Sequence, residues 1–350
     1  MNKKIDIQSL VRKNVWALTP YSSARDEFTD MNAEMIFLDA NENPFQTNVN
    51  RYPDPWQRGV KEILADQKEM KIENILLGNG SDEVLDLLMR AFCEPGIDNV
   101  ITLPPTYGMY KVLSGINNIE NIEVTLTSEF EPKVSEILRK ANSESKLLFI
   151  CSPNNPTGNS FSEKSIELLL ENFSGLVVID EAYIDFSNKE SWLRMLINYP
   201  NLVITQTLSK AYGMAGIRLG ICYASAEIIS VLNKIKPPYN VNALTQVQAV
   251  ERLLNIDKLK NEIDSLIIEK NVLSKALLEV NFAKKIFLSD TNFVLVRVDD
   301  ADFRYQQLID NGIVVRNRSS QKLCENTLRF TIGTPEENKK LINTLKKLQS

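Results

Sequence analysis

Short apolar runs alternate with amphipathic segments over the middle of the chain. The apolar runs have the length of buried strands, and apolar residues at helical spacing separate several of them. This alternation predicts an α/β fold with a mostly parallel, doubly wound central sheet sandwiched by helices. The predicted strands are Asn74–Leu77, Val100–Leu103, Lys146–Cys151, Leu176–Asp180, Leu202–Gln206 and Leu219–Tyr223, and the predicted helices are Ser81–Phe92, Ser162–Glu171 and Trp192–Tyr199.

The pattern changes near residue 245. From Gln246 to Leu278 the spacing of apolar residues is helical, and Pro and Gly are absent. We therefore expect an irregular N-terminal arm over residues 1–35 that contributes to a small domain, a large domain over residues 36–245, and a small α/β domain over residues 246–350. The small domain is predicted from short apolar segments at Asn292–Val298, Gly312–Val315 and Thr327–Ile332 and from a helix at Asp302–Asn311.

Composition places the chain among ordinary globular proteins. Its 350 residues are 43% hydrophobic and 24% charged, enough for one large or two moderate domains. The net charge of −5 gives no electrostatic reason to expect nucleic acid or an anionic membrane as a partner. Asp6, Arg12 and Lys13 interrupt the first apolar segment, which therefore does not resemble a signal peptide. No apolar run is long enough for a membrane span, and we expect a cytoplasmic protein.

The absence of histidine limits the chemistry. The chain contains no histidine, which excludes Ser-His-Asp and Cys-His nucleophile systems, HExxH zinc sites and the two-His-one-carboxylate iron site. A general acid or base must then be Asp, Glu, Lys, Tyr or Cys, or must belong to a cofactor. The four cysteines form no CxxC pair, so we expect buried free thiols and no metal site.

Polar residues follow four of the predicted strands. A glycine turn at Gly78–Asp82, an Asn-Pro turn at Asn155, an acid and a tyrosine at Asp180 and Tyr183, and a lysine at Lys210 each come directly after an apolar run. Ligands of open parallel sheets bind beyond the carboxyl ends of the strands. These residues are therefore expected to form one site.

Each of these motifs has an ordinary structural explanation by itself. The glycine turn can simply start a helix, the Asn-Pro-Thr-Gly segment can be a turn, Asp180 can be a cap, and Lys210 can be a solvated surface lysine. The turn is not a GxGxxG fingerprint, because Glu83 stands at the third glycine position, and it lacks the Gly-Lys-Ser/Thr of a Walker A loop. The order of the motifs and their shared position at strand ends are far more specific than any one of them.

The combined residues match the requirements of pyridoxal 5′-phosphate. A lysine near cations has a lowered pKa and forms Schiff bases. An aspartate opposite a pyridinium nitrogen holds that nitrogen protonated and strengthens the ring as an electron sink. Tyrosine and asparagine can hydrogen-bond the phenolate oxygen, and a helix N-terminus with an arginine can hold the phosphate.

The motifs resemble those of a known enzyme family. The segments GNGSDE, CSPNNPTG, VVIDEAYIDF, TLSKAYGMAGIRLG and LRFTIGT resemble the class II aminotransferases of fold type I, which depend on pyridoxal phosphate. Further segments are similar to the histidinol-phosphate aminotransferases within that family, namely LTPYSSAR, LDANENP, RYPD, RAFCEPG, PPTYGMY and VVRNR. The matches run in order from about Leu18 to Thr334, which is nearly the whole chain.

The resemblance implies a role for each cofactor residue. Lys210 forms the Schiff base and moves a proton, Asp180 pairs with the ring nitrogen, and Asn155 and Tyr183 bind the phenolate oxygen. Tyr107 stacks on the ring. The cofactor phosphate is held by Gly80, Ser81, Asp82, Ser209 and Arg218, together with Tyr52 across the interface of a homodimer.

The resemblance also implies substrate-binding residues. Tyr21, Arg316 and Arg329 would bind a phosphate or a carboxylate, because the planar guanidinium binds both groups bidentately. Arg329 lies in an apolar run and needs a partner there. Arg318 is an alternative to Arg316, which we place in the site because it directly follows an apolar segment. Asn242 is a weaker candidate.

The reaction implied by the resemblance is a ping-pong transamination. It converts L-glutamate and imidazole acetol phosphate into 2-oxoglutarate and L-histidinol phosphate, a step of histidine biosynthesis. A broad or aromatic aminotransferase and a threonine-phosphate decarboxylase use the same cofactor residues and remain alternatives. A non-catalytic binding module and a nicotinamide-dependent oxidoreductase are disfavoured, the latter because the GxGxxG pattern fails.

Overall fold

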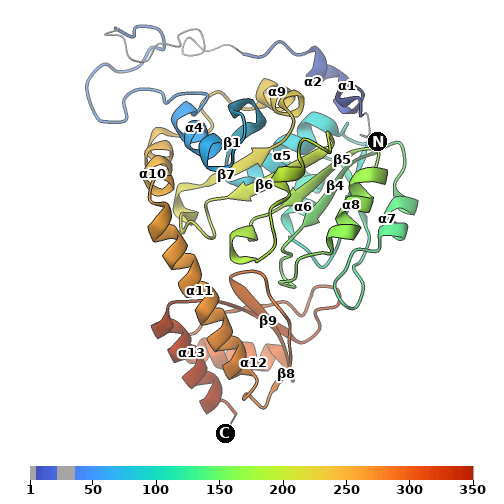
Figure 1. Cartoon of the computed structure of the whole chain (residues 1–350), viewed down its shortest axis with the longest axis vertical. Coiled ribbons are helices and arrows are strands. Elements are labelled where there is room, and N and C mark those ends of the chain that lie inside the picture. The colour runs from blue at the N-terminus through green and yellow to red at the C-terminus, as the bar shows by residue number, and fades with distance from the viewer. Residues whose placement is uncertain (1–4, 22–35, 350) are drawn as a thin grey trace.

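The computed structural model describes residues 5–21 and 36–349, which fold around two sheets (Figure 1). The larger sheet has seven strands in the order β1-β7-β6-β5-β4-β2-β3. Strands β3, β2, β4, β5 and β6 pair in parallel, whereas β7 is antiparallel to both β6 and β1. The predicted mostly parallel α/β fold is therefore confirmed. The strands are β1 (Ile75–Asn79), β2 (Asn99–Thr102), β3 (Glu120–Glu123), β4 (Ser145–Cys151), β5 (Leu176–Asp180), β6 (Leu202–Thr207) and β7 (Leu219–Tyr223).

Helices cover both faces of this sheet because side chains alternate between faces along each strand. In β5, for example, Val177 and Ile179 belong to one buried cluster and Val178 belongs to the other. The first cluster includes residues of α4 (Arg58–Gln67), α7 (Val134–Lys140), α8 (Glu163–Asn172) and α10 (Ala243–Leu253). The second includes residues of α1 (Ile7–Leu10), α2 (Lys13–Ala17), α5 (Ser81–Phe92), α6 (Met109–Ile116) and α9 (Ala226–Ile235).

A smaller sheet lies at the end of the molecule away from α1 and α2 (Figure 1). Its four strands are antiparallel in the order β10-β11-β9-β8. A separate apolar cluster packs this sheet against the C-terminal helices. The elements are α11 (Ile256–Leu277), β8 (Ala283–Ile286), β9 (Phe293–Val298), α12 (Ala301–Asp310), β10 (Arg316–Asn317), β11 (Thr327–Thr331) and α13 (Pro335–Lys347), and short 3-10 helices occur at η1 (Ile72–Asn74), η2 (Ile184–Phe186), η3 (Trp192–Met195) and η4 (Ala215–Ile217).

The structure corrects four local predictions. The single helix expected over Gln246–Leu278 is two helices, because the chain turns at Leu254 and Asn255 between α10 and α11. The segment Gly312–Val315 is not a strand; the strand of that region is the two-residue β10. The helix expected over Trp192–Tyr199 is reduced to the four-residue η3.

The fourth correction concerns the N-terminal arm. Its described part is not irregular but forms α1 and α2. Ile7 and Val15 are buried against the large sheet's second cluster, and that burial holds the two short helices in place. Residues 22–35 of the predicted arm lie outside the described residues.

The proposed domain division falls inside an element, since residue 245 lies within α10 and Ala249 and Leu253 of that helix pack into the large-sheet core. The division at this residue remains a proposal. All four cysteines are buried and unpaired, as expected. Among the described residues, no helix has the length and apolar character needed to cross a membrane.

Candidate active site

A cavity of about 560 Å³ opens at the carboxyl ends of the parallel strands. Cys151 and Asp180, the last residues of β4 and β5, lie in its wall. The motifs that follow four separate strands therefore do meet, as their order predicted. The predicted site residues that line this cavity are Ser81, Asp82, Tyr107, Asn155, Asp180, Tyr183, Ser209, Lys210, Arg218, Arg316 and Arg329.

Asp180 is the buried acid of the cavity. Its side chain accepts a hydrogen bond of 2.7 Å from the hydroxyl of Tyr110 and one of 3.1 Å from the backbone N–H of Ala182. Burial raises the pKa of Asp180, and these two hydrogen bonds oppose that rise because they stabilise the carboxylate. The carboxylate is thus fixed in orientation at the floor of the cavity.

Tyr110 was not among the predicted site residues. It is fully buried, and its ring stacks on Phe149 with centroids 5.0 Å apart. Tyr107 precedes α6 and Tyr110 lies in its first turn, and the two rings meet edge to face with centroids 5.6 Å apart. In the sequence Tyr110 resembles a core aromatic residue, and its contact with Asp180 is what distinguishes it.

Lys210 follows β6 and lines the same cavity. Its Nζ lies 5.8 Å from the centre of the Tyr183 ring. Burial lowers the pKa of Lys210, the positive charge of Arg329 lowers it further, and the charge of Asp180 opposes both. The amine is therefore easier to deprotonate than a solvated lysine.

Two glycines shape the end of the cavity where α5 begins. Gly80 has φ +78°, and a Cβ there would lie 2.6 Å from Nη2 of Arg218. A Cβ on Gly220 of β7 would lie 2.2 Å from the backbone nitrogen of Ser81. Only glycine lets the N-terminus of α5 approach β7 and Arg218 this closely. The free N–H groups of that N-terminus favour a bound anion.

Side-chain hydrogen bonds order the remaining polar groups. The Tyr107 hydroxyl donates to Asp82 Oδ1 at 3.0 Å, and the Thr207 hydroxyl donates to Ser209 Oγ at 3.0 Å. Burial raises the pKa of Tyr107, and the negative charge of Asp82 adds to that rise. Tyr107 is therefore a neutral aromatic wall at physiological pH.

Arginines from the smaller sheet close the other side of the cavity. Arg316 of β10 lies opposite Arg329 of β11 in the strand register, and Arg318 lines the cavity as well. The Arg329 guanidinium donates to Asn155 Oδ1 and lies 4.9 Å from the centre of the Phe293 ring. Both sheets therefore contribute to one site.

These arginines are short of hydrogen-bond acceptors. Among the described residues, the buried Nε atoms of Arg318 and Arg329 have no partner. Burial lowers the pKa of Arg318 to about 10, and the charges of Arg329 and Arg316 contribute. Repelling guanidinium groups with unused donors favour a bound anion. The structure places both Arg316 and Arg318 in the wall of the cavity, so either arginine can reach a ligand bound there.

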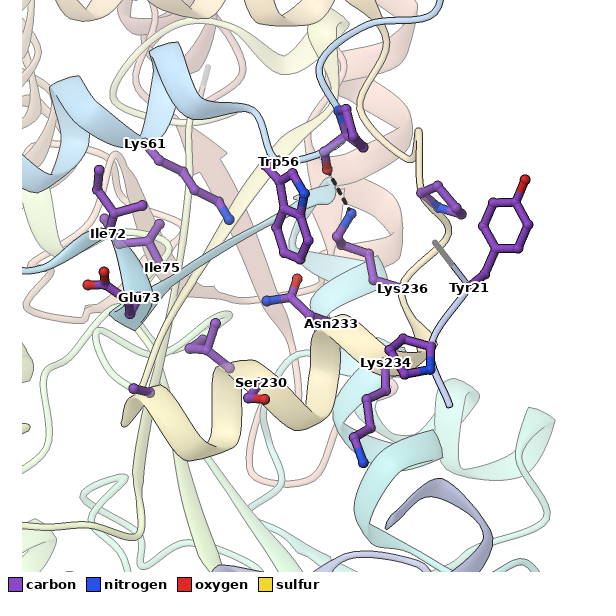
Figure 2. Close-up of a pocket in the computed structure, with 15 residues that line it drawn as sticks. Tyr21, Trp56, Lys61, Ile72, Glu73, Ile75, Ser230, Asn233, Lys234 and Lys236 are labelled. Carbon is purple, nitrogen blue, oxygen red and sulfur yellow. Dashed lines mark hydrogen bonds between the residues drawn. The ribbon is translucent and has the colours of Figure 1, made fainter. Parts of the chain in front are cut away.

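Four predicted residues are not among those that line this cavity. Gly80 directly precedes the lining residue Ser81, whereas the other three lie elsewhere. Tyr52 is half exposed and stacks on Tyr239 with ring centroids 4.4 Å apart. Asn242 caps α10, its side chain accepting from the backbone N–H of Thr245 at 2.9 Å. Tyr21 lines a second cavity, between α4 and α9 (Figure 2). Within one chain, Tyr52, Asn242 and Tyr21 therefore do not line the cavity that contains Lys210. Their predicted roles remain proposals.

The comparisons with known proteins agree with the geometry. The model of the family "Aminotransferase class I and II" matches residues 36–345, so the chain belongs to this family. The chain is 66% identical over 344 residues to a histidinol-phosphate aminotransferase of Flavobacterium johnsoniae, and the match covers 98% of this chain and 99% of that relative.

Two solved structures are similar in fold. A histidinol-phosphate aminotransferase from Sinorhizobium meliloti, in complex with pyridoxal-5′-phosphate, has a TM-score of 0.78 and 22% identity over 86% of this chain and 84% of that one. An L-threonine-O-3-phosphate decarboxylase from Porphyromonas gingivalis has a TM-score of 0.72 and 21% identity over 86% of this chain and 91% of that one. The fold is thus shared by enzymes of different reaction types.

Proposed function

We propose that the chain transfers the amino group of L-glutamate to imidazole acetol phosphate, giving L-histidinol phosphate and 2-oxoglutarate in histidine biosynthesis. The observation that carries this proposal is the group of Arg316, Arg318 and Arg329 on the wall of the cavity that Lys210 also lines. The buried Nε atoms of Arg318 and Arg329 have no partner among the described residues. The near full-length identity to a histidinol-phosphate aminotransferase supports the choice over the decarboxylase of similar fold.

The residues of the cavity fit pyridoxal 5′-phosphate as the cofactor. A buried acid, a lysine of lowered pKa and a glycine-built anion cradle beside Arg218 line the same space. Lys210 would hold the cofactor covalently, Asp180 would face its ring nitrogen, and Ser81, Ser209 and Arg218 would hold its phosphate. When bound, the cofactor supplies an electron-withdrawing ring that stabilises negative charge at the substrate carbon.

The chain's own residues then orient the substrate and move the proton. Asp180, held by Tyr110 at 2.7 Å, would keep the ring nitrogen protonated, because its negative charge stabilises the positive charge on that nitrogen. The lowered pKa of Lys210 lets its amine accept a proton from the substrate carbon and return it. Asn155 and Tyr183 line the wall beside these two residues and would orient the ring by hydrogen bonds.

The arginines would select the substrate. The tetrahedral phosphate of one substrate and the planar distal carboxylate of the other are both anions with two terminal oxygens that a guanidinium can bind bidentately. The Nε donors of Arg318 and Arg329 are free for this contact among the described residues. One cluster of arginines would thereby serve both half-reactions in turn.

The active unit is proposed to be a cytoplasmic homodimer. Tyr52 is 50% exposed, although it is an aromatic residue in a site motif, and it lies with Asn242 beside a surface hollow rather than beside Lys210. Exposed apolar side chains line the same hollow, Val49 at 54% and Leu244 at 65%. If a second copy of the chain covered this surface, Tyr52 of the first copy would contact the cofactor phosphate bound by the second copy.

The test is substrate profiling of the purified holoenzyme. With glutamate and imidazole acetol phosphate, mass spectrometry should detect histidinol phosphate and 2-oxoglutarate. Faster turnover of phenylalanine than of histidinol phosphate would replace the proposal with a broad aminotransferase, and carbon dioxide released from threonine phosphate would replace it with a decarboxylase. Light scattering separately tests the dimer, which a monomeric mass at assay concentration would refute.

A further inference from the structure

A second cavity, remote from the strand ends, lies between α4, η1 and α9 (Figure 2). Its volume is about 600 Å³, within the range of sites that hold small molecules. The walls are largely apolar, with the indole of Trp56, the aliphatic side chains of Ile72, Ile75 and Ile229, and Pro55. None of the predicted cofactor residues lines it, although Tyr21, which the resemblance assigns to the substrate, does. The two cavities have no lining residue in common.

A buried lysine enters this cavity without a partner. Lys61 is only 3% exposed, and Figure 2 shows its side chain running from α4 toward Trp56. Its Nζ lies 5.9 Å from the indole centre, and among the described residues no acceptor bonds it. The nearby Asp54 does not serve as its partner, because that carboxylate is bonded to Arg58 at 2.8 Å.

The other polar groups of the cavity define what an occupant must offer. Lys236 is satisfied, since its Nζ donates to the carbonyls of Pro55 and Pro237 and to Asn240 Oδ1. Asn233, by contrast, is drawn pointing into the cavity, and its buried Oδ1 has no partner among the described residues (Figure 2). Among the described residues, the cavity therefore presents the Lys61 ammonium and the Asn233 amide oxygen without partners, beside an indole and apolar walls. The carboxylate of Glu73 and the hydroxyl of Ser230 also line it, and the exposed Glu73 lies at the η1 side of the cavity.

We propose that this cavity binds a small, ring-bearing carboxylate that also carries an N–H or O–H donor. A carboxylate would satisfy the Lys61 ammonium, the donor would satisfy Asn233 Oδ1, and the ring would lie against Trp56. A single available ammonium matches a monoanion better than a doubly charged phosphate, for which this chain uses several arginines elsewhere. Unpaired buried polar groups are costly, and such a ligand removes both costs at once.

The test measures binding to the purified holoenzyme by titration calorimetry with three probes. The probe 4-hydroxybenzoate has the ring, the carboxylate and the donor, benzoate lacks the donor, and phenol lacks the charge. We expect 4-hydroxybenzoate to bind most tightly. Failure of 4-hydroxybenzoate to bind at any soluble concentration would overturn the proposal.

Two variants of the cavity resolve the two contacts. Lys61→Met keeps the length of the side chain and should weaken 4-hydroxybenzoate by about tenfold or more, because a hydrogen bond to a charged group is lost. Asn233→Leu should lower the affinity for 4-hydroxybenzoate to that for benzoate and leave benzoate itself unchanged. Equal affinity of 4-hydroxybenzoate for the wild type and for Lys61→Met would refute the site.

Two further variants serve as controls. Lys270 is another buried lysine, but its Nζ already donates to the Thr291 carbonyl at 2.9 Å, so Lys270→Met should leave the affinity unchanged. Arg329→Met tests whether the probes bind the arginines of the first cavity instead. Binding lost in Arg329→Met but kept in Lys61→Met would place the probe in the first cavity and overturn the proposal.

Discussion

The two cavities each contain a lysine whose pKa is lowered by burial, yet their surroundings differ. Both lysines have charged neighbours of each sign, which for Lys210 are Arg329 and Asp180. Lys210, however, stands among polar side chains at the strand ends. Lys61 stands on a helix between apolar walls, with Lys236 lowering its pKa and Asp54 raising it. A lowered lysine pKa therefore marks only a desolvated amine. The neighbouring groups decide whether that amine can react or only bind.

The largest expected effect distinguishes the reactive amine. Lys210→Ala should reduce turnover by more than about 10³-fold, because both covalent attachment and proton transfer are lost. Amino transfer from glutamate is followed by 2-oxoglutarate formation, with Lys189→Ala, a surface substitution, as the control. Wild-type turnover in the Lys210→Ala variant would show that Lys210 is not the reactive amine.

The second effect concerns the buried acid of the first cavity, Asp180, since the acid that lines the second cavity, Glu73, is exposed. Asp180→Asn should reduce kcat by about 10²-fold, because a neutral amide cannot stabilise positive charge on the group it faces. Asp185→Asn is the matched control, since the pKa of Asp185 is also raised by burial but this residue does not line the cavity. Similar kcat values for the two variants would show that burial of an acid, and not its position, matters.

A smaller effect is expected at the support of that acid. Tyr110→Phe removes the 2.7 Å hydrogen bond to Asp180 and leaves the stack on Phe149, so kcat should fall by about tenfold. The matched control is Tyr223→Phe, because the buried hydroxyl of Tyr223 has no partner among the described residues. If Tyr110 only stabilised the fold, Tyr110→Phe would leave the pH profile of kcat unchanged. Loss of its hydrogen bond to Asp180 should instead shift that pH profile.

The smallest effect is a change in stability at the second cavity. Lys61 has a pKa lowered to about 8, so its buried charge weakens the fold below that pH. Above pH 8 the Lys61 ammonium loses its proton in the folded protein but keeps it in the unfolded chain. The destabilisation caused by its buried charge therefore declines as the pH rises toward 10.5, the ordinary pKa of lysine. Lys61→Met should therefore raise stability by about 1 to 3 kcal/mol at pH 7.

Urea unfolding at pH 7 and pH 10 measures this difference. The advantage of Lys61→Met should shrink at the higher pH, where the wild-type lysine is largely neutral when folded. Lys270→Met should instead destabilise the protein, since it removes the donor to Thr291. A destabilised Lys61→Met would mean that the ammonium has a favourable partner, which would weaken the case for a ligand there.

The sequence predicted the first cavity well and the second not at all. Residues such as Asn155, Asp180 and Lys210 each follow an apolar run, and the carboxyl ends of parallel strands must meet at one edge of a sheet. Lys61 and Asn233 lie on amphipathic helices far apart in sequence, where a lysine or an asparagine normally faces water. Nothing in their spacing indicates that they share a cavity.

The limits of local patterns explain the other errors. The break between α10 and α11 carries no Pro or Gly, so helical spacing could not locate it. Tyr110 was missed because an aromatic residue on an apolar helix face looks like core, and only its contact with Asp180 reveals its role. Tyr52 lies away from the cavity of its own chain, and its proposed place in a second subunit depends on an assembly.

By itself, the sequence determined the fold class, the four strand-end motifs and the exclusion of histidine chemistry. These depend on periodicity, order along the chain and residue type, all of which are local or countable. The tertiary structure decided which buried groups have partners. Asp180 has Tyr110, whereas the Nε atoms of Arg318 and Arg329 and the ammonium of Lys61 have none within residues 5–21 and 36–349. Whether a polar atom is satisfied depends on contacts between segments distant in sequence, and only the packed chain brings those segments together.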